Sequence, residues 1–167
     1  LGSDIDGDEA YDSSGVSVSL SADGSIVAIG ANGDRYNGSG IGHTRIYQYS
    51  SGSWSQLGSD IEGEANNDYS GEYVSLSSDG TIVAIGAKSN DGNGNASGHT
   101  RIYQYSSGSN SWSQLGSDID GEAAYDYSGR ATLSADGSIV AIGAINNDGN
   151  GNASGHTRIY QYSSGSN

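Results

Sequence analysis

Short apolar runs recur along the chain, and each run ends at a cluster of Gly, Asp, Asn or Ser. In the first 56 residues there are four such runs, at 16–20, 25–31, 43–49 and from 53 through 56 into the following LGSDI. The run IVAI is apolar on both faces, as a strand buried between two sheets is, whereas a sheet with one wet face alternates more cleanly. Runs of this length with this punctuation predict an all-β fold of short antiparallel strands.

Self-comparison divides the chain into three repeats, at 1–56, 57–114 and 115–167, which span 56, 58 and 53 residues. Each repeat opens with LGSDI and carries IVAIGA and GHTRIYQYSSGS. The third repeat lacks the SWSQ segment of the other two, so we expect its structural unit to be incomplete. It also reads SGRATLS where the second reads SGEYVSLS, and this one-residue deletion predicts a bulge or register shift before Leu133.

The four runs of each repeat predict one four-stranded antiparallel sheet. Asp-Gly pairs at 23–24, 79–80 and 136–137 separate the first two runs and favour hairpin turns with positive φ. A period near 57 residues suits a β-propeller blade with long loops better than one coil of a β-helix. Closed propellers use about 4 to 8 blades, so we expect these three to leave two sheet faces exposed, as a partial propeller or a segment that assembles further.

The first repeat also resembles a known family. SGVSVSLSADGSIVAIGA followed by GHTRIYQY is similar to the FG-GAP repeat of integrin-α-like propellers, with Ser14-Gly15 at its Phe-Gly and 29–31 at its Gly-Ala-Pro element. The resemblance covers all three repeats, although the chain contains neither Phe nor Pro and shortens the family's calcium loop to Asp-Gly. It implies a propeller fold and an extracellular adhesive or matrix role, but likeness of fold assigns no ligand.

Charge excludes some classes of partner. The chain carries 6 Lys and Arg against 20 Asp and Glu, a net charge of −14, so its surface would repel the phosphate backbone of a nucleic acid. No apolar run approaches the roughly 18 residues that a membrane helix needs. The chain has no Cys, so disulfides do not stabilise the fold.

The start of each repeat is acidic, with carboxylates at relative positions one, three, five and nine. They are Asp4, Asp6, Asp8 and Asp12; Asp60, Glu62, Glu64 and Asp68; and Asp118, Asp120, Glu122 and Asp126. Calcium loops use similar alternate spacing, because alternate loop residues can place several oxygens around one ion, and this predicts a calcium site. The alternative is a solvated acidic segment that caps turns, since the sharp-turn glycine expected at position six is absent.

The connection between the second and third runs is rich in Asn and Gly, and antiparallel pairing places it on the same face as the acidic segment. In every repeat it holds an Asn-x-Ser sequon, at Asn37, Asn95 and Asn152. In a secreted eukaryotic protein these residues would accept glycans. The alternative is turn chemistry alone, which favours the same residue types.

Each repeat has one His, followed two residues later by an Arg, at the start of its third run. Without a Cys or a Ser in a nucleophile setting beside it, the His is expected to be structural, the Arg to pair with the acidic segment, and the protein not to be an enzyme. Tyrosine pairs on the same strand, such as Tyr47 and Tyr49, are expected to pack between blades, with a sugar-stacking platform as the alternative. Trp54 and Trp112 are expected to cover the blade flank.

These observations favour an extracellular structural or adhesive propeller segment that is N-glycosylated and forms fibrils. End faces that do not close a ring give a filament, so further copies of the same chain are the expected partners, together with glycans or cell-surface and matrix proteins. The alternative is a lectin-like or calcium-dependent carbohydrate-binding module with equivalent sites in each repeat.

Overall fold

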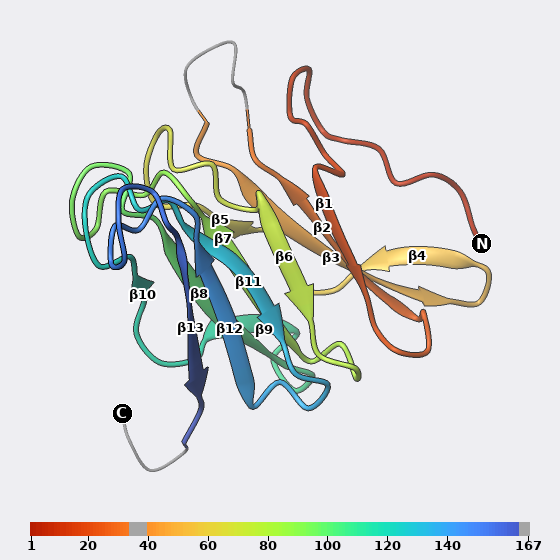
Figure 1. Ribbon diagram of the computed structural model, residues 1–167. Helices are drawn as coiled ribbons and strands as arrows, with labels where there is room; N and C mark the ends of the chain where they lie inside the picture. The colour runs from red at the N-terminus through yellow and green to blue at the C-terminus, as the bar shows by residue number, and fades with distance from the viewer. Residues whose placement is uncertain (34–39, 164–167) are drawn as a thin grey trace.

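The computed structural model describes residues 1–33 and 40–163, and these form thirteen β-strands and no helix (Figure 1). The strands are β1 Ser17–Leu20, β2 Ile26–Ala31, β3 His43–Ser50, β4 Ser53–Gln56, β5 Ile61–Glu62, β6 Tyr73–Leu76, β7 Ile82–Ala87, β8 His99–Ser106, β9 Ser111–Gln114, β10 Ile119–Asp120, β11 Ser128–Leu133, β12 Ile139–Ala144 and β13 His156–Gln161. Among the described residues no helix is long and apolar enough to cross a membrane.

The strands form three antiparallel sheets, one per repeat. The first has the order β1-β2-β3-β4, the second repeats it as β6-β7-β8-β9, and the third is β11-β12-β13. The outer strand of the first two sheets is split: β4 pairs with the end of β3, and β5, which belongs to the next repeat, pairs with its start. The predicted run from Ser53 into LGSDI is therefore confirmed, and it carries each sheet across the repeat boundary.

A compact hydrogen-bonded turn joins the first two strands of every sheet. In the first sheet the Asp23 carboxylate accepts hydrogen bonds from the Ser21 hydroxyl and from the Ser25 amide and hydroxyl, and the Ser21 hydroxyl oxygen accepts one from the Ile26 amide. Asp79 and Asp136 occupy the same place in the other sheets. Only the Gly of each Asp-Gly pair has a positive φ, and five residues separate the two strands, so a longer connection replaces the two-residue turn that Asp-Gly alone favours.

The one-residue deletion in the third repeat has the predicted effect. The pairing of β11 with β12 shifts register between Ser128 and Arg130, which leaves Gly129 as the extra residue of a bulge. Gly129 has φ +143°, a conformation that side chains rarely adopt. The bulge therefore keeps the apolar residues of β11 in step with β12 despite the deletion.

The sheets stack face to face, with their first strands β1, β6 and β11 side by side (Figure 1). The first interface buries Ile26, Ala28 and Ile46 of one sheet against Val74 and Leu76 of the next. The second interface repeats this arrangement between Ile102 and the pair Val140 and Ile142. Serine hydroxyls also join the inner strands, as where the Leu76 amide donates to Ser19 Oγ at 2.9 Å.

Both outward sheet faces are exposed, as expected. Val18 and Leu20 are 63% and 59% exposed, although Val74 at the same repeat position is only 8% exposed. At the opposite end Ile159 is 72% exposed, whereas its equivalent Ile46 is fully buried. The chain therefore presents at each end a surface that its interior sheets cover.

Candidate functional site

The repeated His and Arg lie where each third strand meets the outer strand of its sheet. His43 pairs with Glu62 across β3 and β5, and His99 pairs with Asp120 across β8 and β10. Because β5 and β10 belong to the following repeat, this pairing brings acidic residues of two successive repeats to one histidine. A cluster of acid, His and Arg side chains forms at each repeat junction.

The second junction has the more buried cluster. His99 Nδ1 lies 3.8 Å from Glu64 Oε2 and 3.7 Å from Asp118 Oδ2. The other oxygens of the two carboxylates face Arg101, which forms an ion pair with Glu64 Oε1 and another with Asp118 Oδ1 at 3.1 Å. Each carboxylate thus directs one oxygen to the guanidinium and one to the imidazole.

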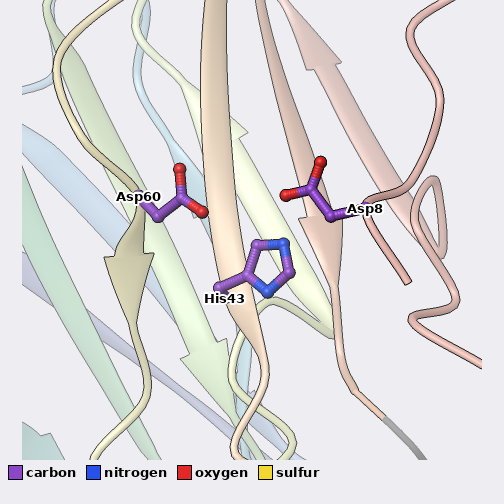
Figure 2. A group of neighbouring side chains, drawn as sticks. All are labelled: Asp8, His43 and Asp60. Atoms are coloured by element: carbon purple, nitrogen blue, oxygen red, sulfur yellow. The ribbon is translucent and has the colours of Figure 1, made fainter.

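At the first junction the equivalent residues are Asp8, His43 and Asp60, whose potential ligand atoms all lie within 4.8 Å of one another. Figure 2 shows the two carboxylates on either side of the imidazole ring. Arg45 is buried here, and its Nη1 contacts Asp8 Oδ1 at 2.6 Å. The prediction that the Arg pairs with the acidic segment is confirmed at both junctions.

The third repeat holds part of the same cluster. His156 Nδ1 lies 3.6 Å from Glu122 Oε2, and Arg158 Nη1 lies 3.8 Å from Glu122 Oε1. Arg158 also donates a hydrogen bond to the Asp120 carbonyl. The carboxylate that corresponds to Asp60 and Asp118 comes from the following repeat, so within residues 1–167 this cluster is made by Glu122, His156 and Arg158.

Each histidine has one buried ring nitrogen without a hydrogen-bond partner: Nε2 of His43, Nδ1 of His99 and Nε2 of His156. His99 is 3% exposed, and its Nδ1 is buried and makes no hydrogen bond. Burial lowers the pKa of His99, and the neighbouring Asp118 opposes that shift only in part. Burial of this imidazole therefore favours its neutral form.

The structure does not gather the acidic residues of one repeat around one point. Asp60 lies at the first junction and Glu64 at the second, although both belong to the same segment. The Asp68 carboxylate accepts a hydrogen bond from Asn90 Nδ2 at 2.9 Å, and Asp126 binds Asn147 in the same way. The sequence predicted that these acidic residues form a site. It did not predict that they divide between two junctions, or that a histidine lies between them.

The remaining acidic residues do not belong to either group of three potential ligands. Asp4 and Asp6 are exposed on the irregular first segment, and the Asp6 carbonyl accepts a hydrogen bond from Arg45. Glu62 and Asp120 sit on β5 and β10, and Asp12 Oδ2 lies 3.9 Å from His43 Nε2. Among the described residues, only the two junction clusters bring three potential metal ligands together.

The sequon loops are held by their own hydrogen bonds. Asp91 Oδ1 accepts from the Ala96 amide at 2.7 Å, and Ser97 Oγ accepts from the Asn93 amide and donates to the Asn90 carbonyl. Asn95 and Asn152 are exposed, and Asn37 lies outside the described residues. The Asn95 carbonyl also accepts a hydrogen bond from the Tyr125 amide, which ties this loop to the acidic segment of the next repeat.

Comparison with known proteins supports the fold. No family model matches the chain, and no curated protein matches it. Among solved structures it is similar to Kuenenia stuttgartiensis hydrazine synthase, with 9% identity and a TM-score of 0.50 over 87% of this chain and 44% of that one. It is also similar to the tricorn protease, with 11% identity and a TM-score of 0.43 over 78% of this chain and 11% of that one.

The class of fold follows from the sheets and this likeness. Hydrazine synthase contains β-propellers, and the chain spans less than half the length of either solved protein. The protein is an all-β protein of the β-propeller type, built from three tandem antiparallel blades. At these identities the likeness concerns the fold alone.

Proposed function

We propose that this protein is an extracellular structural building block whose blades stack head to tail onto further copies of the same chain. The observation that carries the proposal is the equivalence of its two end faces with its own internal interfaces. Ile139 and Ile159 stand at the repeat positions of Ile26 and Ile46, and Val18 and Leu20 stand at those of Val74 and Leu76. The contact between two chains can therefore copy the contact between the first two blades.

The free energy gained by covering these exposed faces supports the same proposal. Exposed aliphatic side chains at both ends cost free energy in water, at about 25 cal/mol for each Å² of apolar surface left uncovered. A contiguous apolar sheet face of this kind usually marks an interaction surface. Its complement is already part of the chain, so a second copy needs no other partner to cover it.

Strand pairing adds a second contribution. Among residues 1–33 and 40–163, no fourth strand lies beside β13, whereas β3 and β8 pair with Ile61–Glu62 and Ile119–Asp120 of the next repeat. Ile5 and Asp6 stand at the same repeat position and form no strand in the single chain. In the proposed contact this segment of a second chain pairs with the start of β13 and covers the open edge.

Such a contact is heterologous, because the tail of one chain meets the head of the next. Repetition closes a ring if the rotation per chain divides a full turn, and otherwise builds a filament. The acidic segments and the exposed Asn95 and Asn152 then lie in a regular array along the assembly. N-linked glycans on these residues would coat it, which fits an extracellular location.

Two end-face variants test the proposal. Val18→Lys blocks the head and Ile159→Lys blocks the tail, and both positions are exposed enough in the single chain to accept a lysine. Each variant alone should be monomeric in sedimentation velocity, whereas an equimolar mixture should form a 1:1 dimer through the two intact faces. Ser113→Lys, at an exposed position on β9, is the control and should assemble like the unmodified chain.

Sedimentation velocity distinguishes the possible outcomes. Assembly by all variants, or a monomeric unmodified chain at concentrations of about 100 μM, where even weak specific contacts form, would refute the proposal. A mixture that stays monomeric while the unmodified chain assembles would place the contact elsewhere on the molecule.

One observation favours carbohydrate binding as a second function. Tyr11 and Tyr125 stand at the same repeat position in the acidic segment and are 59% and 57% exposed. Exposed tyrosines on a polar loop face can stack on sugar rings. A glycan array measured with calcium and with a chelator tests this function. If Tyr125 stacks on the sugar, Tyr125→Ala should weaken the array signal.

A further inference from the structure

The junction clusters contain an unusual combination of groups. His99 is almost completely buried, yet its Nδ1 has no hydrogen-bond partner and faces two carboxylate oxygens at 3.7 and 3.8 Å. These separations are too long for hydrogen bonds. They are close to the spacing of about 3.4 Å between two ligand atoms that each lie about 2.1 Å from one ion in tetrahedral geometry.

Arg101 fixes the carboxylates in this arrangement. It binds Oε1 of Glu64 and Oδ1 of Asp118, so Oε2 and Oδ2 remain directed towards the histidine. A second shell that orients ligands in this way is typical of metal sites in proteins. The partial exposure of Glu64 and Asp118 leaves the cluster open to solvent on one side, where water can complete the coordination.

We propose that each complete junction binds one divalent transition-metal ion, such as Zn²⁺, through one imidazole nitrogen and two carboxylate oxygens. The second site consists of Glu64, His99 and Asp118, and the first consists of Asp8, His43 and Asp60. One nitrogen and two carboxylate oxygens suit zinc and related ions, whereas calcium takes six to eight oxygen ligands. The ligand set therefore differs from the calcium loop that the acidic spacing predicts.

The sites join neighbouring repeats. In each site one carboxylate and the histidine come from one repeat, and the second carboxylate comes from the next. An ion held between them stabilises the folded chain, because the separated ligands of the unfolded chain bind it less well. Metal binding should therefore raise the melting temperature.

If chains assemble head to tail, a third metal site forms where two chains meet. The third site rests on the proposed function. Glu122 and His156 supply two ligands at the end of the third repeat. Asp4 stands at the repeat position of Asp60 and Asp118 and is exposed in the single chain. In the assembly, Asp4 of a second chain would complete this site.

The experiment uses the full chain carrying Val18→Lys, so that it remains monomeric whether or not the unmodified chain assembles. After equilibrium dialysis against Zn²⁺, elemental analysis should give two zinc ions per chain. His43→Gln and His99→Gln should each lower this number by one, and the double variant should bind none. His156→Gln is the matched control and should still bind two.

A second measurement needs no substitution at the site. Long-range ¹H–¹⁵N spectra of the histidine rings should show a shift of Nδ1 of His99 on addition of Zn²⁺, which excess Ca²⁺ should not reverse. Zinc binding that is unchanged in the double variant, no binding at all, or displacement by Ca²⁺ would each overturn the proposal. For unmodified chains that assemble, three ions per chain support the shared site and two refute it.

Discussion

Two equivalent glycines give a sharp test of the blade packing. Gly86 lies on β7 where the second blade meets the third, and a Cβ built there would overlap the carbonyl oxygen of Gly129. Gly143 stands at the same position on β12, but the nearest atom to its Cβ is Arg130 Cβ at 3.6 Å, an ordinary van der Waals contact. The same substitution therefore overlaps backbone at one position and makes only ordinary contacts at the other.

The two substitutions should change the free energy of unfolding in different ways. Gly86→Ala must separate two backbones in a packed interface, which costs about 2–3 kcal/mol of unfolding free energy by comparison with other overpacked cores. For a chain of this size that lowers the melting temperature by about 4–12 °C. Gly143→Ala meets no clash and restricts the unfolded chain, so it should be neutral or stabilising by up to about 1 kcal/mol.

Urea unfolding of both variants, followed by tryptophan fluorescence and circular dichroism in parallel, measures the difference. Trp54 and Trp112 report on the first two blades, because their indoles donate hydrogen bonds to the Leu1 and Leu57 carbonyls. Equal midpoints for the two variants would refute the stacking of the second blade on the third as described.

Three further predictions follow. Hydrogen bonds from neighbouring serines lower the pKa of Asp136 to about 2. The stability that this carboxylate contributes should therefore be complete above a pH of about 4 and be lost as the pH falls towards 2. Asp136→Asn should flatten this part of an acid-unfolding curve. Gly143→Ala should leave the single chain folded but prevent head-to-tail assembly in sedimentation velocity, because its Cβ would meet the Gly15 carbonyl of the next chain as Gly86 meets Gly129. Asn90→Ala should cost about 1–3 kcal/mol in chemical denaturation by leaving the buried Asp68 carboxylate without its amide donor, and a loss below about 0.5 kcal/mol would contradict this.

Local patterns predicted most of the fold. The IVAIGA runs became the buried second strands, the run from Ser53 into LGSDI became the split outer strand, and the deletion before Leu133 became the bulge at Gly129. Each of these features depends on residues close in sequence or on a comparison of one repeat with another. That is why a single sequence was sufficient for them.

The candidate site was much less predictable. Alternate spacing suggested that Asp60, Glu62 and Glu64 would surround one ion, but β5 occupies this stretch and directs Asp60 and Glu64 to different junctions. The assignment of each carboxylate depends on the register of β5 against β3, which is a contact across a repeat boundary. The only signal in the sequence was the constant position of His and Arg in every repeat, and it does not reveal which acidic residues they meet.

The junction, more than the blade, is the repeating unit of stability in this protein. At each junction the apolar interface, the outer strand contributed by the next repeat and the acid, His and Arg cluster all join the same two neighbours. Repeat proteins with this nearest-neighbour organisation gain stability with each added interface, and their terminal repeats are the weakest because each lacks one neighbour. A second chain docked on the third blade would supply all three contributions together, so assembly should stabilise that blade more than it stabilises the second. Hydrogen exchange would reveal this as added protection of the β12 and β13 amides in the assembled form, with β7 and β8 almost unchanged.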